Sequence, residues 1–307
     1  MHKAINVSDL ELHIHGPDGF PGMEDISWVT GLTRLQRMYL LIPLAVAEDT
    51  VLGLFRQING PLEAISIQEM TDIDALLALE EGPFPWSNRS TTYPLAELAR
   101  FSETLREISF DWNNANVGLG MSLASQKLVF PVMRKVHWCS REPIDTGALV
   151  SAFPNLQDLS VCCTCAHEPD DAPGQSMGYN VEAQRRQNQE IQRTRRWSSL
   201  RTLRGHGRCL YMLGLVCPVE HVDIADDWTP VNEKYLQEVL SAAQPTQVEF
   251  HMICFRDYVP NLAQLLPIKS LEEIVLHLLV RVVSVTEDEY EVLKGVITAM
   301  VGLPHVL

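Results

Sequence analysis

The sequence predicts an α/β solenoid, with a curved parallel sheet on the concave face and helices on the convex face. Three observations predict it. A short phrase of the form L-x-x-L-x-L, with other apolar residues replacing some leucines, recurs ten times along the 307 residues. Most copies follow one another at intervals of 19 to 28 residues. Segments with apolar residues at helical spacing lie between the copies.

The clearest copy runs from Leu105 to Asn113 and reads L-x-x-I-x-F-x-x-N. Ile108 and Phe110 are two residues apart, so they point to one side of a strand, while Asp111 points to the other. This is the strand half of a leucine-rich repeat. The whole chain, residues 1–307, is therefore expected to form a single irregular domain of about ten such repeats, each burying its apolar face against its neighbours.

The other copies open at nine positions: Val7, Leu35, Leu62, Met133, Leu156, Leu200, Val219, Pro245 and Leu271. Two intervals, of 43 and 44 residues, exceed the usual repeat length of roughly 20–29 residues and need insertions. Prolines and small polar residues predict that these two insertions are loops near residues 82–94 and 164–196. The second insertion continues into a segment of helical character. The strand that opens at Leu200 is expected to fade after Leu203, and residues 303–307 resemble the start of one more copy.

Helices are expected where apolar residues recur every three to four positions. Asp145 precedes one of them and is a plausible N-terminal cap. The expected helices span residues 49–58, 145–153, 181–196, 232–243 and 287–300. Alternating strands and helices of this length predict parallel strands with helices on one side.

Composition limits the class of protein. The apolar fraction of 46% suffices for a continuous core, and 24 basic against 39 acidic residues give a formal charge of −15. This charge disfavours nucleic acid or an anionic membrane as the partner of the whole surface. The first residues contain no signal-peptide pattern, and no apolar run is long enough to span a bilayer. Seven cysteines without regular spacing suit a reducing compartment, so a cytoplasmic or nuclear location is predicted.

The chain resembles the divergent, F-box-like leucine-rich-repeat proteins of mushroom-forming fungi. The resemblance rests on the repeated phrase and on three stretches, Phe153–Leu159, Leu210–Ile224 and Ser270–Leu276. It implies a non-enzymatic scaffold for protein–protein interactions, such as the substrate-recognition part of a ubiquitin ligase adaptor. Relatives carry an F-box before the repeats, but this sequence opens in a repeat phrase at Val7 and contains no L-P-x-E motif. A Skp/cullin-type ligase is therefore expected as a partner only if an F-box lies outside this chain.

The register of the phrase predicts which strand residues point away from the core and line the concave face. Histidines and a tyrosine are prominent among them, and both residue types suit contacts with a protein partner. The predicted partner-binding residues are His13, Tyr39, Ser66, Asp111, His137, Asp223, Glu249, His251 and His277, and Ser160 shares their register.

An alternative function is binding of nucleic acid or another anion by the arginine-rich segment 185–208. Eight arginines and one acid, Glu190, lie between Ala183 and Arg208. The candidate anion-binding residues are Arg185, Arg186, Arg193, Arg195 and Arg196. The competing interpretation is a solvated helix that pairs with the acidic remainder of the same protein.

No catalytic residue, metal or cofactor is predicted. The stretch Cys162–His167 has zinc-binding residue types, but its C-C-x-C-x-H spacing matches no standard finger. His13 and His15 lack an apparent third ligand, and Asp226 and Asp227 lack a nucleophile or base partner. No nucleotide-binding or nucleophile-elbow motif occurs.

The ends of the sequence suggest self-association. Apolar residues of the first phrase begin at Ile5, and the chain stops at Leu307 inside a phrase. Solenoids usually cover their terminal repeats with polar caps, and exposed apolar strands associate. The 307-residue chain on its own is therefore expected to self-associate or to be poorly soluble.

Overall fold

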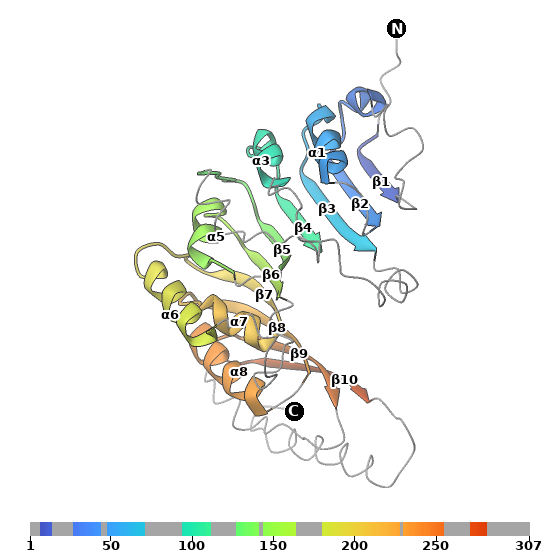
Figure 1. Ribbon diagram of the computed structural model, residues 1–307. Coiled ribbons are helices and arrows are strands. Elements are labelled where there is room, and N and C mark those ends of the chain that lie inside the picture. Colours follow the sequence, from blue (N-terminus) through green and yellow to red (C-terminus); the bar gives the residue numbers. More distant parts are fainter. Residues whose placement is uncertain are drawn as a thin grey trace, which may run out of the picture. The chain divides into compact units, whose positions relative to one another are not determined.

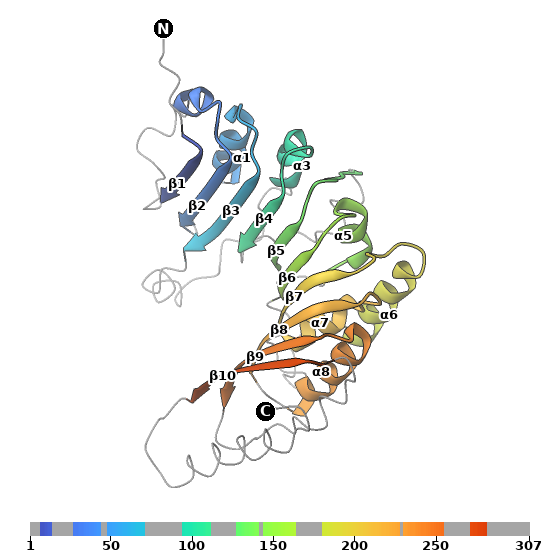
Figure 2. The same cartoon turned by 180° about the vertical axis from the view of Figure 1, so that it is seen from behind.

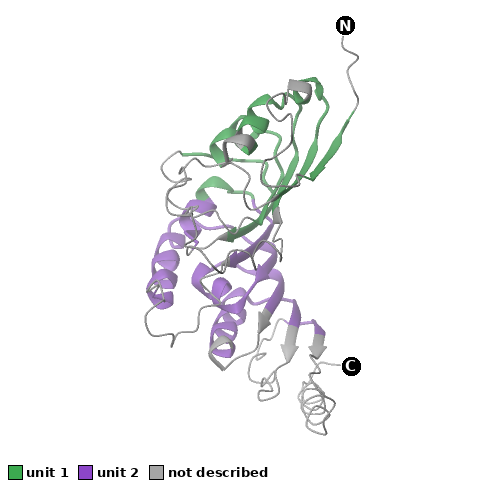
Figure 3. Cartoon of the chain, turned by 45° about the vertical axis from the view of Figure 1, so that its right-hand side comes forward, with its two compact units in different colours: residues 1–142, 151–155 green, residues 143–150, 156–307 purple. Residues whose placement is uncertain are grey.

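Ten parallel strands follow one another in chain order in the computed structural model (Figure 1). The structure describes residues 7–13, 27–43, 48–70, 94–111, 127–140, 144–163, 180–227, 230–254 and 271–280. The chain divides into two compact units, residues 1–142 with 151–155 and residues 143–150 with 156–307 (Figure 3). The predicted α/β class with parallel strands is confirmed.

Each unit contains five of the strands. The first unit holds β1 (Asp9–His13), β2 (Arg37–Pro43), β3 (Ala64–Met70), β4 (Glu107–Asp111) and β5 (Lys135–Ser140). The second holds β6 (Asp158–Cys163), β7 (Leu200–Gly205), β8 (Val219–Asp227), β9 (Gln247–Cys254) and β10 (Glu273–Val280). Within each unit, successive strands pair in parallel. All ten full copies of the phrase therefore lead into a strand, whereas residues 303–307 lie outside the described residues.

The repeated phrase produces the same local structure in successive repeats. Its first apolar residue is buried just before the strand begins, as Leu35, Leu62 and Leu105 show. At six strand entries, one backbone carbonyl oxygen accepts hydrogen bonds from two backbone amides of the next strand entry. The carbonyl of Gln36 accepts from Glu63 and Ala64 at 2.7 and 3.0 Å. The same arrangement recurs at Ser8, Glu63, Arg106, Gln157 and Thr246.

The core is built from every second residue of the strands. Ile108 and Phe110 of β4 are 1–2% exposed, whereas Ser109 between them is partly exposed. The rings of Phe110 and Trp138 on the neighbouring strand meet edge to face with centroids 5.2 Å apart. This alternation separates an apolar face of the strands from a polar one.

Helices lie on one face of the strands in each unit (Figures 1 and 2). The first unit contains η2 (Ser27–Gly31), α1 (Glu48–Gln57), α3 (Pro94–Leu98) and η4 (Ala99–Phe101). The second contains α6 (Val181–Gln192), α7 (Gly207–Leu213) and α8 (Pro230–Ala243), and α5 (Thr146–Ala152) has residues in both units. No helix among the described residues is long and apolar enough to cross a membrane.

Most of the expected helices are present. The Asp145 cap is confirmed, because its carboxylate accepts from the amide of Ala148 at 3.1 Å. Helix α8 begins at Pro230, two residues before the expected start, since proline is well tolerated in the first turn. The expected helix 287–300 and the loops 82–93 and 164–179 lie outside the described residues.

Two expectations about the second unit are corrected. The strand after Leu200 does not fade at Leu203 but continues through Arg204 to Gly205, which pairs with Ile224. The short helix α7 was not expected from the sequence. It begins at Gly207 and is followed by Gly214, and glycines usually indicate a loop rather than a helix. Six of its seven residues are buried, so packing rather than amphipathic spacing holds this helix.

Candidate functional site

Six polar side chains from four adjacent strands meet on the helix-free face of the second unit. We call them the histidine–carboxylate cluster: Arg204 from β7, His221 and Asp223 from β8, Glu249 and His251 from β9, and His277 from β10. The parallel register brings them together. Arg204, Asp223 and Glu249 are register partners across three strands, and His251 is the partner of His277.

The intervening residues fix this orientation. Val222, Ile224, Val248 and Phe250 are completely buried on the opposite face. A shift of one residue in the pairing of a strand would therefore expose its apolar side chains and bury the polar ones. The apolar core of the repeats thus fixes where the polar cluster lies.

Asp223 lies between a cation and a histidine. Its Oδ2 is 3.2 Å from Nε of Arg204, and its Oδ1 is 3.5 Å from Nε2 of His251. Only 7% of the residue is exposed, and Oδ1 is buried without a hydrogen bond. Burial raises the pKa of the Asp223 carboxyl, and Arg204 and His251 oppose that rise.

Glu249 is the centre of the cluster, since three histidines approach its carboxylate. Oε1 lies 3.0 Å from Nε2 of His251 and 2.8 Å from Nε2 of His277, and Oε2 lies 3.4 Å from Nε2 of His221. The rings of His251 and His277 are stacked, with centroids 4.4 Å apart and planes 3° from parallel. Glu249, His251 and His277 each offer a ligand atom within 4.8 Å of the others, so these three could hold a metal ion.

The predicted residues of the first unit also lie on the polar face of their strands. Tyr39, Ser66 and His137 share one register row, and His13 and Asp111 lie in the next. The rings of His13 and Tyr39 on neighbouring strands are 6.3 Å apart between centroids. The Tyr39 hydroxyl donates to Gln68 Oε1 at 2.6 Å, His13 Nε2 is 2.6 Å from Glu11 Oε1, and His137 Nε2 is 3.7 Å from Cys139 Sγ.

Sequence reasoning missed two members of the cluster. Arg204 was missed because the strand was expected to fade before it. His221 is two residues before Asp223 on the same strand, and its burial is intermediate. The alternation that identified Asp223 applies equally to His221, so the signal was present in the sequence.

The arginine-rich segment is partly engaged within the second unit. Arg185 lies 3.1 Å from Glu238 and stacks over the Tyr211 ring at 3.9 Å from its centroid. Arg193 pairs with Glu190 at 2.5 Å. Arg201 and Arg204 pair with Asp158 and Asp223. The side chains of Arg186, Arg195 and Arg196 are exposed. At least four of the eight arginines thus have acidic partners in the same unit.

The cysteine stretch is described only in part. Cys162 and Cys163 end β6, while Cys165 and His167 lie outside the described residues, as does His15. Asp226 and Asp227 end β8. The candidate metal site at residues 162–167 therefore lies mostly outside the described residues.

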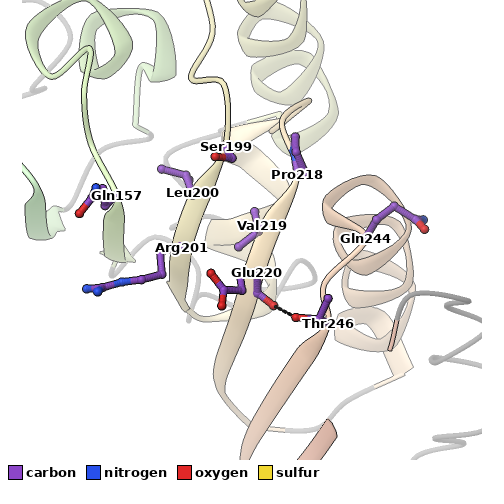
Figure 4. Close-up of a pocket in the computed structure, with 9 residues that line it drawn as sticks. All are labelled: Gln157, Ser199, Leu200, Arg201, Pro218, Val219, Glu220, Gln244 and Thr246. Atoms are coloured by element: carbon purple, nitrogen blue, oxygen red, sulfur yellow. Dashed lines mark hydrogen bonds between the residues drawn. The ribbon is translucent and has the colours of Figure 1, made fainter. Parts of the chain in front are cut away.

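A surface hollow of about 500 Å³ lies at the amino ends of β7–β9 (Figure 4). Its lining comprises Gln157, Ser199, Leu200, Arg201, Pro218, Val219, Glu220, Gln244 and Thr246. Arg201 is bound to Asp158, with Nε 2.9 Å from Oδ1, and the Thr246 hydroxyl donates to the Glu220 carbonyl at 3.1 Å. The lining contains no histidine, cysteine or pair of acids, so the histidine–carboxylate cluster is the stronger candidate site.

Comparisons with protein-family models, with curated proteins and with solved structures found no match to this chain.

Proposed function

We propose that this chain is a leucine-rich-repeat-type solenoid that acts as a non-enzymatic scaffold and binds a protein partner on its helix-free polar face. The repeated strand entry and the parallel strands in chain order support the repeat assignment. A role as the substrate-recognition part of a ubiquitin ligase adaptor is the specific form of this proposal and rests on the resemblance in sequence.

The observation that carries the proposal is the concentration of ionisable side chains on the helix-free face. Strands hold these side chains in fixed positions, so little side-chain and backbone entropy is lost when a partner binds. Glu249, His251 and His277 remain partly exposed there, in contrast to the buried residues that alternate with them. Such a rigid polar surface suits a complementary protein surface.

Charge favours a protein over a polyanion as the partner. The chain carries a formal charge of −15. Asp223 and Glu249 face one arginine in the cluster. A partner with basic or hydrogen-bond-donating groups would complement this face, whereas a phosphate backbone would be repelled.

Paired surface variants test the proposal. Ser66→Arg with Ser160→Arg places two bulky cations on the polar strand face, one in each unit. Ser198→Arg with Ser241→Arg makes the same chemical change at two exposed positions outside that face. Affinity purification from the native source, with circular dichroism to confirm folding, should recover one defined protein with the wild type and the control. Recovery of that protein by the Ser66/Ser160 variant at the wild-type level would refute the assignment of the face.

A further inference from the structure

We infer that Glu249, His251 and His277 form a binding site for a divalent transition-metal ion, with zinc as the best match. The ligand atoms would be Oε1 of Glu249 and Nε2 of both histidines. The three residues belong to the face proposed above to bind a protein partner, but the metal site is argued from their donor atoms and does not require that partner.

The donor set has the chemistry that zinc prefers. Zinc binds imidazole nitrogen and carboxylate oxygen at about 2.0–2.2 Å, and sites with two histidines and one carboxylate leave a position open to water. Imidazole donors disfavour magnesium and calcium, which take oxygen ligands. Among the three side chains, 22% of Glu249, 39% of His251 and 52% of His277 is exposed, so an ion could enter from solvent.

The geometry already brings the donors close. Both Nε2 atoms lie within 3.0 Å of the same carboxylate oxygen, and all three ligand atoms lie within 4.8 Å of one another. Zinc bonds of about 2.0–2.2 Å place neighbouring tetrahedral ligands roughly 3.3–3.6 Å apart. Each histidine Nε2 would therefore move away from Oε1 of Glu249 by a few tenths of an ångström, and the parallel imidazole planes would tilt so that both lone pairs converge on the ion.

The surrounding charge favours a cation. Two carboxylates, Asp223 and Glu249, lie in the cluster with one arginine, Arg204. A divalent ion held by Glu249, His251 and His277 would add positive charge beside both carboxylates.

Asp223 gives an independent indication of a ligand at this place. Only 7% of the Asp223 surface is exposed, so the residue is more than nine-tenths buried, and its Oδ1 makes no hydrogen bond. That oxygen lies 3.5 Å from Nε2 of His251, the atom assigned as a ligand. An unsatisfied buried carboxylate oxygen is costly, and a cation held by His251 would compensate it electrostatically. We assign Asp223 as a residue that positions the ion through charge rather than as a fourth ligand.

The test uses the full 307-residue chain after treatment with a chelator. Isothermal titration with Zn²⁺ should show one ion per chain. His251→Gln and His277→Gln should each weaken zinc binding by about 100-fold or more. Mutating a residue that only supports a metal ligand typically costs about 10–100-fold in affinity, and losing a ligand should cost at least as much. His13→Gln and His137→Gln are matched controls on the polar face of the first unit, and they should bind as the wild type does.

A measurement on the unmodified chain guards against variants that fail to fold. In a chain labelled with ¹⁵N-histidine, Zn²⁺ should shift the Nε2 resonances of two of the ten histidines. Absence of stoichiometric zinc binding to the wild type would overturn the inference. Binding that persists in a folded His251→Gln/His277→Gln double variant would also overturn it, because the ion would then lie elsewhere, for example at residues 162–167.

Discussion

The side-chain amide of Asn188 donates to the backbone carbonyl of Met212 at 2.7 Å, although Asn188 is completely buried. The same amide nitrogen donates to the carbonyl of Ile144 at 2.9 Å, and the side-chain oxygen accepts from the amide of Thr146 at 3.2 Å. Gln192, one turn later, donates to the carbonyls of Leu213 and Gly214 at 3.0 and 2.9 Å. Amide side chains therefore hold helix α6 in place, because they form hydrogen bonds with backbone carbonyls at the end of α7 and with a backbone amide at the start of α5.

Asn188→Ala should lower the free energy of unfolding of the second unit by about 2–4 kcal/mol, because it leaves buried carbonyls without donors. Gln187→Ala, at an exposed position of the same helix, is the control and should change stability by less than about 0.5 kcal/mol. Urea titration and hydrogen exchange of residues 181–192 measure both effects. Equal protection in the two variants would show that these bonds do not hold α6.

Tyr211→Phe should make stability less sensitive to alkaline pH. The Tyr211 hydroxyl donates to the Glu182 carboxylate at 2.9 Å, and burial together with this bond raises the pKa of the phenol to about 12. The unfolded phenol ionises near its ordinary pKa of about 10, so unfolding releases a proton between pH 10 and 12. The stabilisation is complete below pH 10 and is lost as pH rises toward 12, by up to about 1.4 kcal/mol per pH unit.

The measurement is the difference in urea midpoint between wild type and Tyr211→Phe, taken at several values from pH 7 to 11. Both proteins share all other titrating groups, so their difference isolates the Tyr211 phenol. The wild-type advantage should be constant up to about pH 9 and then shrink. A constant difference through pH 11 would contradict the raised pKa.

Cys217 should resist thiol reagents in the native chain. It is 1% exposed, and burial raises the pKa of its thiol to about 11, so almost no reactive thiolate is present at pH 8. Iodoacetamide at pH 8, followed by peptide mass spectrometry, should modify partly exposed Cys162 well before Cys217. In urea the two rates should converge, and rapid native labelling of Cys217 would contradict its burial.

The strands could be predicted from the sequence because each depends on a local rule. Alternation of apolar residues placed Ile108 and Phe110 in the core, and the same register placed Asp223, Glu249, His251 and His277 on the polar face. The interactions of those side chains could not be predicted in the same way. These interactions depend on which strands are adjacent in the sheet. The repeats that contain β8, β9 and β10 begin 26 residues apart in the sequence, so no local pattern shows that their side chains meet.

The helices were harder because their signals were weaker or absent. Helix α6 was expected from its composition, but its buried contacts come from Asn188 and Gln192, residue types that normally mark a solvated face. Helix α7 is short and flanked by glycines, so neither its apolar residues nor its glycines indicated a helix. In both cases tertiary contacts outweighed the local pattern.

Gly205→Ala should strongly destabilise the second unit. Gly205 lies on β7 with φ at 156° and is the register partner of Val161 on β6. A Cβ at this position would lie 2.3 Å from the carbonyl oxygen of Val161, a backbone atom that cannot rotate away. The β6 and β7 strands would have to separate, so we expect a loss of roughly 3 kcal/mol or more.

The matched control is Gly31→Ala, because an added Cβ there meets no atom within 4 Å. It should leave stability within about 0.5 kcal/mol of the wild type. Hydrogen exchange of the β6 and β7 amides locates the effect: protection should fall at residues 158–163 and 200–205 in the Gly205 variant alone. If Gly205→Ala keeps full protection there, the close approach of these two strands is wrong, because no side chain at that position can avoid the Val161 carbonyl while the pairing persists.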